Sequence, residues 1–146
     1  MDLIKSMNIS ASGLSANRKR IEAISSNIAN VNTTQTAEGG PYRRKDVVFT
    51  AEPAREKFSD ILEGTMDESA KAVHATEVQS DNRPPIMKYE PTHPDADETG
   101  HVAYPNINVA AEMADMISAQ RTYEANANAM NITKRMALKA LEIGKN

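Results

Sequence analysis

The residues of this chain best suited to chemistry gather in one short segment, residues 92–101. Two imidazoles and three carboxylates fall within nine residues: His93, Asp95, Asp97, Glu98 and His101. Such groups bind divalent metals, and Asp95–Gly100 matches the first six positions of a calcium-binding loop. The twelfth position would be Asn106 in place of the bidentate Glu, and Pro105 interrupts the run. We therefore expect an exposed acidic turn and no metal.

The rest of the sequence offers little for catalysis. The third histidine, His74, stands apart on an expected strand, and the chain has no cysteine, which excludes thiol catalysis, disulfides and Cys-based metal sites. No glycine-rich phosphate loop, nucleophile elbow or metalloprotease motif is present. We expect a protein that is not an enzyme and has no cofactor and no small-molecule substrate.

Charge is unevenly distributed along the chain. Residues 1–45 carry a net +4, residues 46–105 a net −8 and residues 106–146 a net +1, giving −3 in total. A nucleic-acid interface needs a basic face with stacking aromatic residues, and neither is present, so no nucleic-acid partner is expected. No apolar run reaches about 18 residues, so the protein should not be membrane-inserted. The N-terminus lacks the basic and then apolar pattern of a Sec signal peptide.

Both ends of the chain carry apolar residues at alternating steps of three and four. The first stripe is Ile4, Met7, Ala11, Leu14, Arg18, Ile21, Ser25 and Ile28, and the second is Met113, Met116, Gln120, Tyr123, Ala127, Met130, Lys134, Ala137 and Leu141. This spacing places residues on one side of a helix, where another helix can pack. It predicts two long terminal helices that form an antiparallel coiled coil.

The two helices have different boundary signals. The first should run from Leu3 to about Val31, and the second should begin near Asn106 or Asn108, either of which can cap it. The first half of the N-terminal helix is rich in residues of poor helix propensity, namely Ser6, Asn8, Ser10, Ser12, Gly13 and Ser15. We therefore expect the N-terminus to be disordered in the free monomer and to become ordered on assembly.

The middle of the chain is expected to be rich in β-structure. Strands are predicted over Tyr42–Thr50, Lys71–Gln79 and Ile86–Tyr89, while residues 51–70 could form a short helix or a packed loop. The predicted fold class is α+β: residues 1–33 and 106–146 form the helical domain, and residues 34–105 form a small β-rich insertion at one end of it.

Several motifs resemble one protein family. The segment Ser26–Thr33 resembles the motif that closes the first helix in bacterial flagellar rod and hook proteins. Further segments resemble the proximal-rod members of this axial family: Thr34–Arg44, His93–Asp97, Gly100–Val102, Tyr104–Val109 and Ala119–Asn126. The resemblance covers both ends and most of the middle, with residues 51–70 as the exception.

The resemblance implies a structural subunit of the flagellar basal-body rod, located in the periplasm and exported by the flagellar type III apparatus without a cleaved signal. Its terminal helices would polymerise around the export channel and transmit torque, and its partners would be copies of itself and other axial proteins. The residues expected to contact other subunits are Ile4, Met7, Leu14, Ile21, Asn27, Ile28, Asn30, Asn32, Met113, Met116, Tyr123, Met130 and Leu141.

Two other hypotheses follow from the same residues. One is a soluble coiled-coil adaptor or binding module, which would form a monomer or closed dimer and no open polymer, since helical stripes also support closed dimers. The other is a metal-dependent enzyme that uses residues 93–101, which calorimetry with calcium, zinc and manganese would test.

Overall fold

A computed structural model describes residues 3–53 and 71–143 and contains two long helices with four strands between them. In chain order the elements are α1 (Leu3–Ala29), β1 (Lys45–Pro53), β2 (Lys71–Ser80), β3 (Ile86–Tyr89), β4 (His101–Tyr104) and α3 (Val109–Ile143). This arrangement confirms two terminal helices with a small antiparallel β segment between them. Most of residues 51–70, whose structure the sequence left open, lie outside the described residues.

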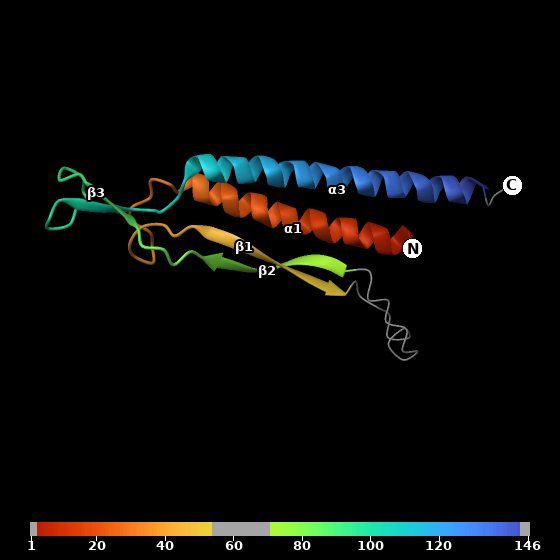
Figure 1. The fold of residues 1–146 in the computed structure, drawn as a ribbon, viewed down its shortest axis with the longest axis horizontal. Helices are drawn as coiled ribbons and strands as arrows, with labels where there is room; N and C mark the ends of the chain where they lie inside the picture. The colour runs from red at the N-terminus through yellow and green to blue at the C-terminus, as the bar shows by residue number, and fades with distance from the viewer. Residues whose placement is uncertain (1–2, 54–70, 144–146) are drawn as a thin grey trace.

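The two helices lie side by side and run in opposite directions (Figure 1). Arg20 of α1 forms an ion pair with Asp115 of α3 at 3.8 Å, and nearer the N-terminus Gly13 faces Asn126. A Cβ atom at Gly13 would lie 2.9 Å from the Asn126 amide nitrogen, so the two helices approach closely at this point. The close approach depends on small residues, because alanines are buried on both helices: Ala16, Ala23 and Ala119.

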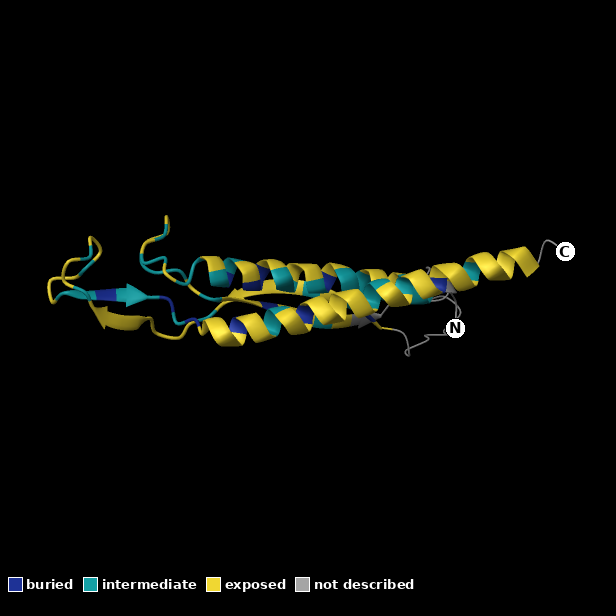
Figure 2. Cartoon of the chain, turned by 90° about the horizontal axis from the view of Figure 1, so that it is seen from above, coloured by how far each residue is buried: buried dark blue, intermediate teal, exposed yellow. Residues whose placement is uncertain are grey.

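The face of α1 that packs inside the chain differs from the predicted stripe. Its buried residues are Ala16, Ala23, Ile24 and Asn27, whereas Ile4, Ala11, Arg18 and Ser25 of the stripe are exposed. On α3 the buried residues are Glu112, Ala119 and Thr133, which are spaced by multiples of seven residues. Each of them precedes a residue of the predicted stripe by one position. The long α3 therefore shows mostly exposed residues along its outer side (Figure 2).

Strands β1 and β2 form an antiparallel ribbon that runs along α1. The Ser12 hydroxyl accepts a hydrogen bond from the Val73 backbone N–H at 3.2 Å, and the Lys19 ammonium donates to the Ala75 carbonyl at 3.3 Å. These bonds hold the ribbon to the helix by satisfying β2 backbone groups. The expectation that residues 34–105 lie at one end of the helices is therefore wrong for this ribbon, because polar side chains of α1 provide a second packing surface.

The remaining strands, β3 and β4, form a second antiparallel hairpin beyond the end of the helix pair (Figure 1). The predicted strand Ile86–Tyr89 is confirmed as β3, with Ile86 opposite Tyr104 and Tyr89 opposite His101. Its partner β4 was not predicted as a strand, because four residues between a polar loop and Pro105 carry too little alternation to be recognised. Val102 of β4 is fully buried.

The boundary residues of the helices agree with capping chemistry. Asn108 is the cap of α3: its side-chain oxygen accepts from the Ala111 N–H at 3.2 Å and its carbonyl accepts from the Glu112 N–H at 3.0 Å. At the end of α1, the Asn30 side chain donates to the Ser26 carbonyl at 2.8 Å. Asparagine satisfies the backbone groups that a helix end leaves open, as the sequence predicted.

Candidate assembly site

A polar cluster with a buried centre joins the two helices to the ribbon at the point where α1 ends, β1 begins and α3 begins. Asn27 is 0% exposed and Glu112 is 2% exposed, and the Asn27 side-chain amide donates to Glu112 Oε2 at 3.0 Å. Arg44 donates from Nε to Glu112 Oε1 at 2.6 Å. One carboxylate therefore connects α1, α3 and the residue before β1. We call Asn27, Tyr42, Arg44, Lys45 and Glu112 the polar joint.

The Asn27 side-chain amide also forms hydrogen bonds with both backbone groups of Lys45, the first residue of β1, as a neighbouring strand would. It accepts from the Lys45 backbone N–H at 2.8 Å and donates to the Lys45 carbonyl at 2.9 Å. The Tyr42 hydroxyl donates to the same Asn27 oxygen at 3.1 Å and lies 3.0 Å from the Ser26 hydroxyl. A side-chain amide offers the same donor and acceptor as a peptide group, so the start of the ribbon is fixed to the end of α1.

The two opposite charges at the centre of the joint, Arg44 and Glu112, form an ion pair. Partial burial lowers the pKa of Arg44, but its hydrogen bond to Glu112 and the charges of Glu112 and Asp46 outweigh burial and raise it overall. Arg44 therefore stays protonated. Glu112 lies in the first turn of α3, where the helix dipole favours a negative charge. No buried side-chain nitrogen or oxygen atom of the described residues lacks a hydrogen-bond partner, so the joint can act as a fully satisfied lock.

The predicted subunit-contact residues fall into three groups. Ile4, Asn32, Met113, Tyr123 and Leu141 are exposed, with Ile4 at 67%, Met113 at 56% and Leu141 at 69%. A second group is half-buried: Met7, Leu14, Ile21, Ile28, Asn30, Met116 and Met130. Asn27 alone among them is fully buried, and its bonds lie within the chain. The structure brings the second group toward the helix pair and leaves the first at the surface.

The acidic segment 92–101 has a structural use within the chain. One Asp97 carboxylate oxygen accepts from the Thr99 N–H and hydroxyl and from the His101 N–H at 2.7 to 2.8 Å. These hydrogen bonds lower the pKa of Asp97, and the bond from the His101 backbone N–H has the largest effect. Asp95 accepts from the Thr34 hydroxyl at 2.6 Å. Across residues 3–53 and 71–143, no group of three or more His, Asp or Glu side chains is placed to hold a metal ion.

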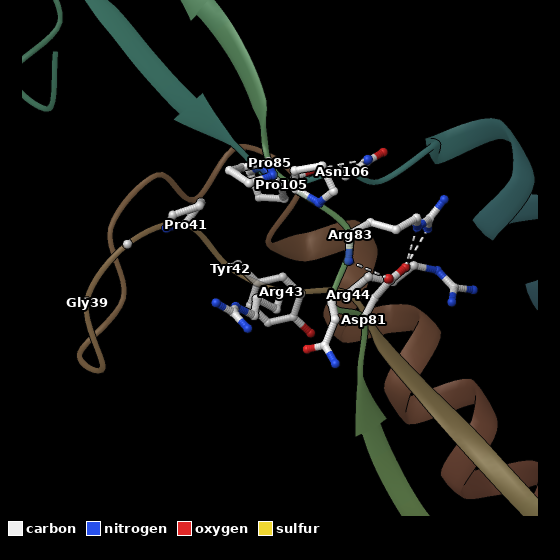
Figure 3. A pocket seen from close by; sticks show the side chains of 13 residues that line it. Gly39, Pro41, Tyr42, Arg43, Arg44, Asp81, Arg83, Pro85, Pro105 and Asn106 are labelled. Carbon is white, nitrogen blue, oxygen red and sulfur yellow. Dashed lines mark hydrogen bonds and ion pairs between the residues drawn. The ribbon is translucent and has the colours of Figure 1, made fainter. Parts of the chain in front are cut away.

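A cleft of about 200 Å³ lies where the loop at Gly39 meets the linkers before β3 and after β4 (Figure 3). Four prolines line it, namely Pro41, Pro84, Pro85 and Pro105. Two of its three arginines are paired, since Arg83 donates to Asp81, which also lines the cleft, at 2.6 Å and Arg44 donates to Glu112. None of its lining residues is a histidine or a hydroxyl nucleophile of the serine or threonine type. The four prolines make this cleft a stiff corner of the fold.

Sequence reasoning did not find the pairing of Arg44 with Glu112. The two residues lie 68 positions apart, and each fits a solvated charge at a helix start or in a basic segment. The one available signal was the polar character of a position next to each apolar stripe: Asn27 beside Ile28, and Glu112 beside Met113. These polar positions do not indicate which residue each of them pairs with, since opposite charges occur throughout the chain.

The fold and the joint define a class of protein: an elongated structural subunit whose two chain ends form a helix pair. Residues 7–35 match the family described as "Flagella basal body rod protein", and residues 98–143 match "Flagellar basal body rod FlgEFG protein C-terminal". None of the helices described is long and apolar enough to cross a membrane.

Curated relatives narrow this class. The chain is 43% identical to "Flagellar basal-body rod protein FlgC" of Bacillus subtilis over 99% of this chain and 100% of the relative. Proteins with the same name from Borreliella burgdorferi and Salmonella typhimurium are 40% and 36% identical, over 98% and 99% of this chain and 98% and 100% of theirs. The chain belongs to the FlgC family and is a structural subunit of the flagellar basal-body rod. The relatives' names indicate no catalytic function.

Proposed function

We propose that this rod subunit polymerises through its terminal helices as coiled-coil pairs with neighbouring subunits, which enclose the export channel. The main support for the proposal is that about half of the residues in each predicted helical stripe are exposed at the surface of the chain. Met113 and Leu141 on α3 remain 56% and 69% exposed although they follow the helical spacing of a packing surface. Apolar side chains in such a row favour burial by another helix, at about 25 cal/mol per Å².

The polar joint supports the torque-bearing part of the proposal. Torque transmission requires that the ribbon and the helix pair move as one body. A hydrogen-bonded, charge-balanced lock of Asn27, Arg44 and Glu112 opposes a change in the angle between them, since any rotation would leave buried polar groups unpaired. The acidic residues 46–105 would then form the outer layer, around a helical scaffold of opposite sign, since residues 1–45 carry +4 and residues 106–146 carry +1.

Export and location belong to the same proposal. We infer that the chain reaches the periplasm through the flagellar type III apparatus, without a cleaved signal, and joins other rod proteins there. The weak helix propensity of residues 6–15 supports this, because a chain that crosses a narrow channel must remain unfolded until it assembles. Far-UV circular dichroism of the dilute protein should then show less helix than the 27 and 35 residues of α1 and α3.

The assembly surface is tested by Met113→Asp, which places a charge in the exposed row of α3. The matched control is Ser118→Asp, an equally neutral-to-acidic change at another exposed position of the same helix. We expect cells with Met113→Asp to lose swimming and complete basal bodies, whereas Ser118→Asp cells swim. Circular dichroism of both purified variants should match the wild type. Normal basal bodies in the Met113→Asp strain would overturn the proposed role of this row.

A further inference from the structure

One carboxylate attaches the turn between β3 and β4 to the loop that follows α1. Asp95 Oδ2 accepts a hydrogen bond from the uncharged Thr34 side chain at 2.6 Å, across 61 positions of sequence. The loop continues from Thr34 to Tyr42 of the polar joint, and the Tyr42 backbone N–H donates to the Thr33 carbonyl at 3.1 Å. The contact between Thr34 and Asp95 therefore connects the hairpin to the part of the chain that carries the joint.

The His93 imidazole binds the backbone of the same aspartate. The Asp95 N–H donates to His93 Nδ1 at 3.1 Å, and a backbone N–H can only donate, so Nδ1 carries no proton in this structure. The backbone of His93 is held on both sides: its N–H donates to the Glu90 carbonyl at 3.0 Å, and its carbonyl accepts from the Ala96 N–H at 3.1 Å. The same Nδ1 lies 3.9 Å from Asp95 Oδ2, the oxygen that binds Thr34.

The charged groups around the His93 ring come from its own turn and from the hairpin. The ring packs against the Tyr104 ring of β4, with centroids 6.4 Å apart. The Tyr104 hydroxyl donates to Glu90 at 2.9 Å, and the Lys88 ammonium of β3 lies 4.4 Å from the centre of the Tyr104 ring. Asp95 adds a second carboxylate. Among these residue types, histidine is the one that ordinarily changes its charge between about pH 5 and pH 8.

We propose that His93 is a proton-controlled latch between the β3–β4 turn and the loop after α1. A proton taken up from solvent at Nδ1 removes the lone pair that accepts from the Asp95 N–H, so that two donors face each other. The imidazolium N–H then has the Asp95 carboxylate as its charged acceptor. A charge-assisted hydrogen bond of about 2.7–2.9 Å requires Nδ1 and Oδ2, now 3.9 Å apart, to approach each other by about 1 Å.

This approach draws Asp95 Oδ2 away from the Thr34 hydroxyl, because both groups use the same oxygen. The contact between Thr34 and Asp95 is therefore complete at pH values above the titration of His93 and is lost as the pH falls through it. Acidification releases the β3–β4 turn from the loop after α1. The inference goes beyond the proposed function, because it concerns contacts within one chain and does not depend on polymerisation.

The second histidine of the turn is built differently and provides a control. The Thr99 hydroxyl donates its single hydrogen to Asp97 at 2.7 Å, so His101 Nδ1, 2.9 Å from the same hydroxyl, is the donor to it. A further proton enters His101 at Nε2 and leaves these hydrogen bonds intact. Protonation of His101 is therefore not expected to move Asp95.

An NMR titration of the isotope-labelled full chain from about pH 8 to about pH 5 tests the latch. The backbone amide signals of Asp95 and Thr34 should shift with the same midpoint as the His93 ring. In His93→Asn the side-chain oxygen can accept the N–H two residues further on without changing its charge, so neither amide should show this transition. The matched control His101→Asn should leave both shifts as in the wild type.

The variant Thr34→Val separates the two steps of the proposal. It lacks the hydroxyl, so the Asp95 amide should still follow His93 while the amide of residue 34 loses its shift. In the wild type, an Asp95 amide that does not follow the His93 ring would overturn the latch, and so would a transition that persists in His93→Asn. A Thr34 amide that stays fixed while Asp95 responds would overturn the release of the loop.

Discussion

Removal of the carboxylate of Glu112 should destabilise the protein more than the loss of any exposed ion pair. In Glu112→Ala, Arg44 loses a 2.6 Å partner while its side chain is only 20% exposed, and one N–H of Asn27 loses its acceptor. Breaking a buried pair from one side typically costs about 3–5 kcal/mol. Arg44 keeps Asp46 at 3.3 Å, so the lower value of about 3 kcal/mol applies here. The midpoint of thermal unfolding should fall by roughly 6–12 °C.

Urea unfolding followed by circular dichroism measures this loss, and the chain provides a matched control. Arg18 and Glu22 form an ion pair at 3.4 Å with side chains 71% and 64% exposed. Glu22→Ala should therefore change the free energy of unfolding by no more than about 0.5 kcal/mol. Equal effects of Glu112→Ala and Glu22→Ala would refute the reasoning, because burial would then make no difference to the two carboxylates.

A double-mutant cycle separates the pair from general damage to the core. Arg44→Met alone leaves the Glu112 charge buried without its cation and should also destabilise the protein. The cycle uses Glu112→Leu as its other single variant. The double variant Glu112→Leu with Arg44→Met removes both charges, so its loss should be smaller than the sum of the losses in Glu112→Leu and Arg44→Met. Purely additive losses would contradict a coupling between the two side chains. Swimming of the double variant then reports whether the charges matter to the rod beyond stability.

Two further predictions concern the loops. Gly100 and Gly39 both have positive φ, at 79° and 89°, but a Cβ at Gly100 would lie 2.9 Å from the Tyr89 ring and one at Gly39 would meet nothing within 4 Å. Gly100→Ala should therefore destabilise the protein more than Gly39→Ala, whose loss should be about 1 kcal/mol in urea unfolding; equal losses would contradict the steric argument. Because the pKa of Asp97 is lowered in the folded protein, the hydrogen bonds of its turn contribute stability at pH values above the unfolded pKa of about 3.9. This contribution is lost as the pH falls through the lower folded pKa. An NMR titration of the Thr99 amide measures the folded pKa. A midpoint at or above 3.9 would refute this.

The helices were the most predictable part of the fold, because their signals are local. Apolar residues at steps of three and four identify a helix from its own sequence, and Asn108 caps α3 through groups only three residues apart. Strands β1 to β3 were also found from local composition, within three residues of their observed ends. The strand β4 was missed, since its four residues are defined by pairing with β3 and not by their own pattern.

The course of the β1–β2 ribbon could not be predicted from local patterns. Nothing in the sequence around residues 45–80 indicates that Ser12 and Lys19 satisfy backbone groups of β2. The register of α3 was missed for a similar reason. Its apolar stripe was predicted, but the row of residues buried in the structure lies one position earlier, beginning at Glu112. A charged side chain whose hydrogen bonds are satisfied can occupy a helix interface in place of an apolar one.

The sequence by itself determined the class of protein: two helices at the ends, a β segment between them, and motifs shared with flagellar rod proteins. These features depend on residue types at short, fixed spacing, and spacing can be read along one chain. The tertiary structure alone decided that Asn27, Arg44 and Glu112 meet in one polar joint and that the C-terminal end of α3 and the β3–β4 hairpin lie at opposite ends of the molecule. Residues far apart in sequence are brought together or kept apart by packing, which no spacing along the chain records.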